Sequence, residues 1–291
     1  MIEEAIQPER EERLSAERAY ELYWADVLDG DATFLCTGNG CTARLICACL
    51  DKPEQNLRIR PYFRSRRLDD HAPTCEVAHG KAGAAREKGP DVFDAERPRD
   101  HFRERAPSAA PRARTSAPAA PRASRYYRLS SLVQKFLEHR RDGDLDTATV
   151  DMGGETLTYA GLFRNVYRQK VADLTGTRAI WWGTASLRAT REGGYYLRFS
   201  RAFRHDDADL HPTVTLTARD IEAYPVRRLL RARLDKLIAE GGRCVAFLWA
   251  RPWMPKDAES PFVRFYVDNL DHIDVRGMEI LEALQQTSRV R

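Results

Sequence analysis

The chain has 291 residues, of which 43% are hydrophobic and 31% charged, a composition typical of a soluble globular protein. It excludes collagen-like and wholly disordered chains, and no stretch approaches the roughly 18 uninterrupted apolar residues of a membrane-spanning helix. The charged start lacks the apolar segment of a secretory signal, which favours a cytoplasmic protein without membrane contact. In that compartment, six cysteines indicate metal binding or core packing rather than disulfides.

The net charge of +4 arises from 47 basic and 43 acidic residues, and only seven of the basic residues are lysines. Arginine presents a planar fork of donors that matches phosphate and stacks on nucleic-acid bases. A codon bias towards arginine and alanine in a GC-rich genome explains the same excess. The arginine content alone therefore does not identify a partner.

We predict an α+β protein in four parts. Residues 1–80 form a small zinc-binding module, and residues 81–124 form a flexible linker dominated by Arg, Pro, Ala and Ser. Residues 125–176 form a small α/β subdomain. Residues 177–291 form an OB-like β-barrel with a C-terminal helix.

In the N-terminal module, the apolar spacing predicts a helix over residues 8–28. Two short strands follow, around Phe34 and around Ile46, with a glycine-rich turn between them that holds two cysteines. A basic loop, RIRPYFRSRRLDDHAPTC, closes the module at Cys75.

Four residues of this module have the spacing of a structural zinc site. They form two close pairs, Cys36-x4-Cys41 and His71-x3-Cys75, which supply the four soft ligands of a tetrahedral ion. A closed four-ligand set leaves no position for water, so the zinc would be structural. The alternatives are a ligand set that uses Cys47 or Cys49, which could replace one of the pairs, and no metal at all. Cys244 is expected in the core.

The same stretch resembles the N-terminal zinc-ribbon-like module of the bacterial competence-protein CoiA group. The resemblance covers Phe34 to Cys75, where a paired-cysteine turn is followed by an apolar strand and by YFRSRRLDDHAPTC. The first pair has x4 spacing in this chain and x2 in the group. In that group the module precedes a nuclease-like domain.

The C-terminal part begins with a predicted helix over residues 131–140 and a hairpin over residues 147–159, turning at Gly153 and Gly154. A second amphipathic helix is expected around residues 162–167. From residue 177 the order is three strands, a helix and two strands, which resembles an OB-fold barrel; another small α/β barrel or sheet is the alternative.

The alternation in the barrel strands predicts an outward face of aromatic and basic side chains, suited to stacking bases and contacting phosphates. Tyrosines and tryptophans on strands are also common core residues. The candidate nucleic-acid contacts are Trp182, Tyr196, Arg198, Trp249, Arg251, Trp253, Arg264 and Tyr266.

Several enzyme motifs are absent from the sequence: it has no phosphate-binding loop, dinucleotide fingerprint, HExxH or GxSxG. No lysine lies two residues after an acid, the spacing that a restriction-type nuclease core needs. The aspartates at 142, 144 and 146 resemble a calcium loop, but Thr147 stands where that loop requires glycine. The run His205 to His211 is either a solvated turn or a hard-cation site.

Three functions remain open. The first is a non-enzymatic protein that binds nucleic acid, single-stranded DNA or RNA, with a structural zinc. The second is an adaptor in a mobile-element or defence assembly, using the aromatic face for protein partners. The third is a metal-dependent nuclease centred on the run His205 to His211.

Overall fold

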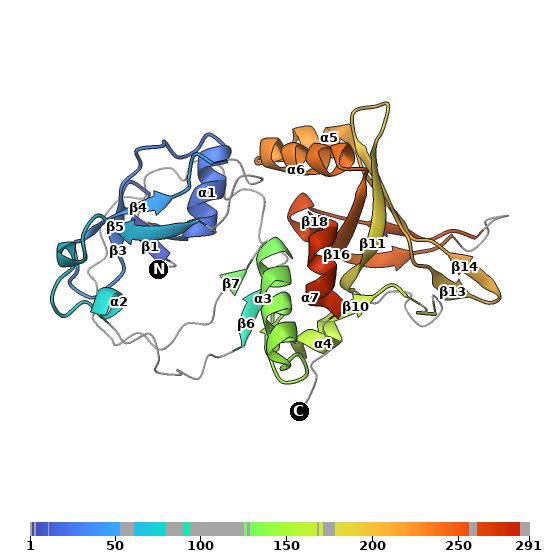
Figure 1. Cartoon of the computed structure of the whole chain (residues 1–291), viewed down its shortest axis with the longest axis horizontal. Coiled ribbons are helices and arrows are strands. Elements are labelled where there is room, and N and C mark those ends of the chain that lie inside the picture. The colour runs from blue at the N-terminus through green and yellow to red at the C-terminus, as the bar shows by residue number, and fades with distance from the viewer. Residues whose placement is uncertain are drawn as a thin grey trace. The chain divides into compact units, whose positions relative to one another are not determined.

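A computed structural model gives the structure of the chain (Figure 1). It describes residues 2, 4–10, 12–52, 61–79, 90–93, 125–126, 129–167, 169–170, 178–255 and 261–285. The described residues form two compact units. The N-terminal unit contains those up to 79 together with residues 225–232, and the C-terminal unit contains residues 90–93 and the other described residues from 125 onward. Both contain helices and strands, so the protein belongs to the α+β class.

The N-terminal unit is built on a five-stranded antiparallel sheet with the strand order β2-β1-β3-β4-β5. Side chains alternate between its two faces, and the inner face buries Phe34, Leu45 and Phe63 against α1. The elements are β1 (Glu4–Gln7), β2 (Glu12–Ser15), α1 (Ala16–Trp24), β3 (Phe34–Cys36), β4 (Arg44–Ala48), β5 (Tyr62–Ser65), η2 (Leu68–Asp70) and α2 (Glu76–His79).

The first predicted helix is wrong in its N-terminal half. Residues 4–15 form the β1–β2 hairpin, and the helix begins only at Ala16, where the Ser15 side chain accepts a hydrogen bond from the Arg18 backbone N–H. The apolar residues before this cap, Ala5 and Leu14, pair with each other across the hairpin and are buried in the sheet.

The predicted linker, residues 81–124, contains a strand. β6 (Asp91–Phe93) pairs in parallel with β7 (Arg125–Tyr126) and with β8 (Thr149–Asp151). Phe93 is 1% exposed, so these residues bury apolar surface that offsets their ordering, and the prediction of a flexible segment is wrong for them. The rest of the predicted linker lies outside the described residues.

The region predicted as a small subdomain packs in the same compact unit as the barrel. α3 (Leu129–Asp142) is followed by the predicted hairpin, β8 with β9 (Thr156–Thr158), whose turn glycines both have positive φ. The helix predicted around residues 162–167 is wrong, because only α4 (Tyr159–Leu162) is helical. β10 (Phe163–Asn165) instead pairs in parallel with β11.

Five strands of the C-terminal unit close into a barrel. Neighbouring strands follow the order β11-β12-β15-β17-β16, and a further pairing of β11 with β16 closes the ring. β15 and β17 run parallel, whereas the other pairs are antiparallel. The strands are β11 (Ala179–Ala189), β12 (Tyr195–Phe199), β15 (Thr213–Leu216), β16 (Arg243–Trp253) and β17 (Arg264–Tyr266).

The predicted order of three strands, a helical segment and two strands is therefore confirmed for the barrel. The helical segment after β15 consists of α5 and α6, and β18 adds to β16 outside the ring. The remaining elements are β13 (Phe203–His205), β14 (Ala208–Leu210), α5 (Ala218–Glu222), α6 (Arg227–Ala239), η5 (Leu270–His272), β18 (Ile273–Arg276), η6 (Met278–Ile280) and α7 (Leu281–Gln285).

The two faces of the barrel wall have different environments. Inside the barrel, Trp181 packs against Phe203 and Phe265, and its indole N–H donates to the Ala250 carbonyl at 3.2 Å. On the outside, α3 and α7 lie next to each other over part of β16 and β18 (Figure 1), where they cover Val245 and Phe247. Elsewhere the outer wall carries exposed side chains, including Ser186, Arg198 and Arg264.

None of the described helices is long and apolar enough to cross a membrane.

Candidate functional sites

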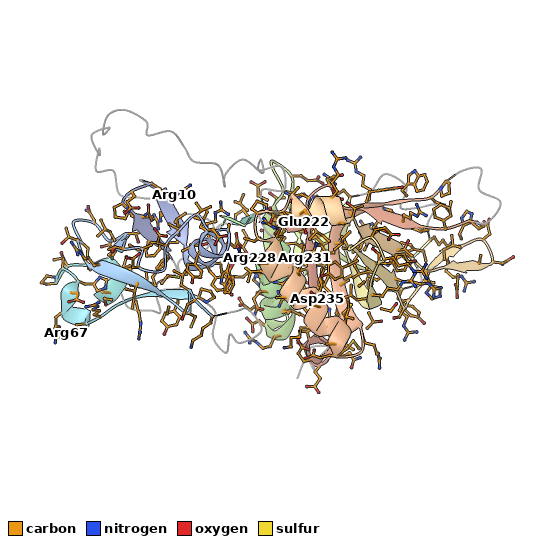
Figure 2. All side chains as sticks on the ribbon, turned by 90° about the horizontal axis from the view of Figure 1, so that it is seen from above. Arg10, Arg67, Glu222, Arg228, Arg231 and Asp235 are labelled. Atoms are coloured by element: carbon orange, nitrogen blue, oxygen red, sulfur yellow. The ribbon has the colours of Figure 1, made fainter. Side chains whose placement is uncertain are left out.

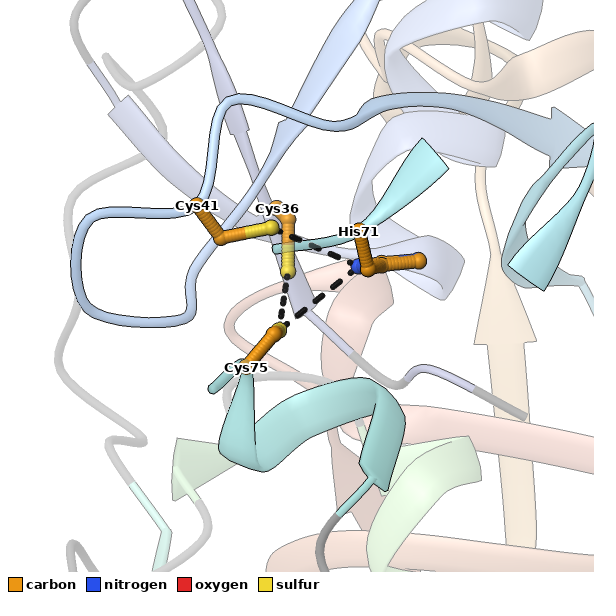
Figure 3. Close-up of side chains that lie close together, drawn as sticks. All are labelled: Cys36, Cys41, His71 and Cys75. Carbon is orange, nitrogen blue, oxygen red and sulfur yellow. Dashed lines mark hydrogen bonds between the residues drawn. The ribbon is translucent and has the colours of Figure 1, made fainter. Parts of the chain in front are cut away.

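The two predicted cysteine and histidine pairs meet at one point of the N-terminal unit (Figure 3). Cys36 ends β3, Cys41 closes the turn that follows it, His71 comes directly after η2, and Cys75 directly precedes α2. All four side chains are buried, and their ligand atoms lie within 4.8 Å of one another. The cluster is therefore compact enough to bind one metal ion.

The distances between these ligand atoms fit a tetrahedral ion. The Sγ atoms of Cys36 and Cys75 are 3.6 Å apart, and His71 Nδ1 lies 3.5 Å from Cys41 Sγ and 3.6 Å from Cys75 Sγ. A tetrahedral zinc, with bonds of about 2.3 Å to sulfur and 2.0–2.1 Å to nitrogen, separates its ligands by about 3.6–3.8 Å. The donor set and these three distances are compatible with a tetrahedral metal ion.

The glycine-rich turn between Cys36 and Cys41 folds tightly around the sulfur atoms. The Gly38 backbone N–H donates to Cys36 Sγ at 3.4 Å, and Gly40 adopts a φ of +67° that favours glycine. The Asn39 N–H donates to the carboxylate of Glu76 on α2 at 3.1 Å. These bonds connect the first ligand pair to the helix that follows the second pair.

The two thiols of the turn differ in acidity. Burial raises the pKa of Cys36 to about 12. Burial also opposes ionisation of Cys41, but hydrogen bonds from the backbone of Ala43 and Ala72 and from His71 outweigh it and lower the Cys41 pKa to about 6. A metal ion bound here has to displace the proton of Cys36.

The other cysteines lie outside this cluster. All six cysteines are free thiols, and Cys47 donates to the Ala16 carbonyl instead of facing the four ligands. Cys49 lies in the turn after β4 with a φ of +67°. The predicted position of Cys244 in the core is confirmed, since it is fully buried and donates to the Ala185 carbonyl.

On the barrel, one row of paired residues runs across all five strands on the outer surface. Each residue of this row pairs directly with the next. In strand order they are Ser186, Arg198, Thr213, Arg264 and Trp253. Directly paired side chains project from the same face of a sheet, so these five lie side by side. The alternate positions Leu197, Phe199, Val263 and Phe265 are buried.

Three large aromatic side chains gather at one end of this row. Trp253, Phe262 and Tyr266 are 43%, 36% and 55% exposed. The Trp253 ring centroid lies 5.9 Å from that of Phe262 and 5.7 Å from that of Tyr266, with the tyrosine ring nearly perpendicular to it. Because the three side chains are exposed, a ligand can contact the faces and edges of their rings.

Four arginines lie on the same outer wall of the barrel. Arg188, Arg198, Arg251 and Arg264 are exposed, and within the described residues none of them forms an ion pair. The guanidinium carbons of Arg188 and Arg264 lie 4.6 Å and 4.7 Å from the ring centroids of Tyr196 and Phe262. We define the aromatic–arginine face as Arg188, Tyr196, Arg198, Arg251, Trp253, Phe262, Arg264 and Tyr266.

The other two predicted contacts, Trp182 and Trp249, lie in a different environment. Trp182 is half-buried, stacked on Phe247 in the core beneath α3. Trp249 is 8% exposed, with Phe93 at one ring edge and the Arg178 guanidinium 5.6 Å from its ring centroid. Neither ring belongs to the exposed aromatic cluster.

Sequence reasoning missed Phe262 and Arg188. Phe262 precedes β17 and is not part of any strand, so the alternation within strands gave no signal for it. Arg188 does follow the alternation, because it pairs with Tyr196 and shares its face. Extending the period along β11 would have identified it.

The acidic run from His205 to His211 forms the end of the β13–β14 hairpin. Asp206 and Asp207 are exposed at the turn, and Asp206 has a φ of +50°. His211 Nδ1 lies 3.0 Å from the Phe199 carbonyl. Among the described residues, only the cluster of Cys36, Cys41, His71 and Cys75 brings metal-binding groups together, which favours the solvated-turn interpretation of this run.

The chain matches no protein-family model, and comparison with curated proteins and with solved structures gives no match either. The resemblance of residues 34–75 to the CoiA group therefore stays a prediction. The structure itself defines the class of protein: an α+β chain with a buried Cys3His cluster in one unit and a closed five-stranded barrel in the other.

Proposed function

We propose that this protein binds single-stranded nucleic acid through the aromatic–arginine face. The observation that carries the proposal is the exposed cluster of Trp253, Phe262 and Tyr266, on the same outer wall as four arginines that form no ion pair with any described residue. Proteins that bind single strands combine aromatic rings, on which bases stack, with a cationic track for the phosphates. Both components lie on one continuous surface of the barrel.

The barrel itself supports this proposal, and we interpret it as an OB-fold. The order of three strands, helices and two strands is that of an OB-fold, whose second and third strands and adjoining loops are the usual binding surface. The corresponding strands here, β12 and β15, carry Tyr196, Arg198 and Thr213 on their outer face. Phe262 and Trp253 lie at the ends of the segment that joins the last two barrel strands.

A single strand fits the face better than a duplex does. The bases of a duplex are stacked inside it, and only their edges face the grooves. The rings of Trp253 and Tyr266 stand on a strand surface, 5.7 Å apart and nearly perpendicular, and are suited to unstacked bases. The arginines contact phosphates in any sequence, so the proposed binding has little sequence preference.

The Cys3His cluster has a structural role in this proposal, with zinc as its metal. Four protein ligands complete a tetrahedral zinc and leave no position for substrate or water. The metal would join the β3–β4 turn to α2, in a unit whose strands are only three to five residues long.

Fluorescence anisotropy with a labelled poly(dT) oligonucleotide tests the proposed function. Tyr266→Ala should weaken binding by about 1–3 kcal/mol, the value of one base stacked on an aromatic ring. Tyr167→Ala is the matched control, because Tyr167 is 46% exposed but lies outside the aromatic–arginine face. Equal affinities of both variants and the wild type would contradict the proposal.

The salt dependence separates nucleic-acid binding from the adaptor function. Binding driven by phosphates weakens log-linearly as salt rises, with a slope of about 0.7 per phosphate contact on a single strand. An aromatic protein interface responds weakly to salt. If the protein shows no affinity for single strands at low salt, the exposed cluster of Trp253, Phe262 and Tyr266 is better explained as a docking surface for a protein partner.

A further inference from the structure

The outer face of the N-terminal sheet carries a second group of arginines, far in sequence from the barrel. Arg44 on β4 and Arg64 on β5 are exposed, and so is Arg66, one residue beyond the end of β5. Ile46, which pairs directly with Arg64, is 39% exposed between the first two. We define Arg44, Arg64 and Arg66 as the N-terminal arginine face.

These three guanidinium groups differ from a neighbouring arginine of the same sheet in their surroundings. Within the described residues, none of them forms an ion pair, whereas Arg13 on the same outer face is paired with Glu4 across the β1–β2 hairpin. On this sheet, Glu4 therefore neutralises the charge of Arg13, whereas no described carboxylate neutralises the N-terminal arginine face.

The placement of these charges is unfavourable without an anion. Arg44 lies two residues from Ile46, which pairs with Arg64, so the two arginines are diagonal neighbours across β4 and β5. Diagonal neighbours on a sheet are about 7–8 Å apart, which is within the screening length of physiological salt, so two like charges at these positions repel each other. A ligand with repeated negative charges would remove this repulsion.

The segments that carry this face adjoin the metal-binding cluster in the sequence. Arg44 follows Cys41 by three residues, and Arg66 precedes His71 by five. The adjoining Arg67 extends outward from the loop after β5 (Figure 2), and the loop is closed by a hydrogen bond from the Arg67 backbone N–H to Asp70 at 2.9 Å. Ligation at Cys41 and His71 would fix both segments and so the spacing of the charges.

We propose that the N-terminal arginine face is a second, independent contact for the phosphate backbone of a nucleic-acid strand. The face offers planar forks of donors that match phosphate oxygens. The described part of the face presents no exposed aromatic ring comparable to Trp253 or Tyr266, so it contributes affinity through phosphates and not through bases. The proposal rests on the proposed function in one respect: it takes nucleic acid as the ligand.

Substitutions in the full-length, metal-replete protein test this second contact. The triple variant Arg44→Gln, Arg64→Gln, Arg66→Gln should bind labelled poly(dT) more weakly than the wild type. Its plot of log affinity against log salt should be shallower by about 2, since each phosphate contact on a single strand contributes about 0.7. Circular dichroism and metal content should be unchanged, because all three side chains are exposed.

Arg13→Gln is the matched control for Arg64→Gln. Each removes one charge from the same sheet face, but Arg13 is already neutralised by Glu4. Arg64→Gln should lower the slope by about 0.7, and Arg13→Gln should leave it unchanged. If both variants lower it equally, the effect is one of net charge, and the proposed contact is wrong.

The same measurements distinguish failure of this inference from failure of the proposed function. If Tyr266→Ala weakens binding while the triple variant has the wild-type affinity and slope, the barrel binds alone and the second contact is wrong. If the triple variant loses binding while Tyr266→Ala does not, the N-terminal arginine face stands and the proposed role of the barrel falls. If neither protein nor variants bind nucleic acid, both proposals are wrong.

Discussion

Gly38 lies so close to Cys75 that a Cβ at position 38 would be 2.6 Å from the Cys75 sulfur. It would also lie 3.4 Å from Cys41 Cβ and 3.5 Å from Cys36 Sγ, so three of the four ligands surround this one glycine. The turn therefore needs glycine at position 38, because a larger side chain would collide with the ligand atoms.

We expect Gly38→Ala to impair metal retention. The added methyl group must displace Cys75 Sγ from the tetrahedral arrangement, because no real Cβ contact is as short as 2.6 Å. Metal release to a colorimetric chelator should be faster than in the wild type. Gly40→Ala is the control: it costs about 1–2 kcal/mol for an alanine at positive φ, but nothing lies within 4 Å of the added carbon. Equal release rates for the two variants would contradict this account.

We expect about one zinc ion per chain in protein purified without chelators. Cys36→Ser should lose it, since it removes one of the four ligands. Cys47→Ser should retain it, because Cys47 faces the Ala16 carbonyl and not the cluster. Elemental analysis of both variants measures the outcome. A folded wild-type protein free of metal, or loss of zinc from Cys47→Ser, would show that the ligand set is wrong.

Substitutions at two adjacent residues of β17 should destabilise the protein by different amounts. Phe265 is 2% exposed and contacts the rings of Trp181, Phe199 and Phe203 inside the barrel. Phe265→Ala should therefore cost about 3–5 kcal/mol. Tyr266→Ala removes only an edge contact with Trp253 and should cost about 0.5–1.5 kcal/mol. Chemical denaturation measures both values, and a reversed order would mean that the register of β17 is wrong.

The acidic hairpin end should be dispensable for nucleic-acid binding. Asp207 is exposed at the turn between β13 and β14, outside the aromatic–arginine face. Asp207→Ala should leave the affinity for poly(dT) unchanged, and the wild-type protein should not degrade the oligonucleotide in magnesium or manganese. Degradation that Asp207→Ala abolishes would instead favour the nuclease function.

The metal site was predictable from sequence because its signal is local. Two pairs of soft ligands at short spacing identify Cys36, Cys41, His71 and Cys75, and the structure brings these four together. The role of Gly38 was not predictable, since its contact with Cys75 joins residues 37 positions apart. Packing contacts of this kind depend on the complete fold.

The barrel was predictable to the level of element order and alternation. Tyr196, Arg198, Arg264 and Tyr266 were placed outward by the strand period, and the structure places them so. Trp249 follows the same period but is covered, because Phe93 comes from a segment whose composition indicated a linker. Alternation along a strand predicts the face of the sheet on which a side chain lies. It does not predict which other segments pack on that face.

Photo-cross-linking tests the central claim most directly. An oligo(dT) strand carrying 5-iododeoxyuridine is irradiated with the full-length protein, and the cross-linked peptides are identified by mass spectrometry. Because Trp253, Phe262 and Tyr266 are the proposed stacking rings, cross-links should concentrate on these residues and disappear with an excess of unlabelled strand. Specific cross-links found only on peptides that lack the aromatic–arginine face would contradict the account.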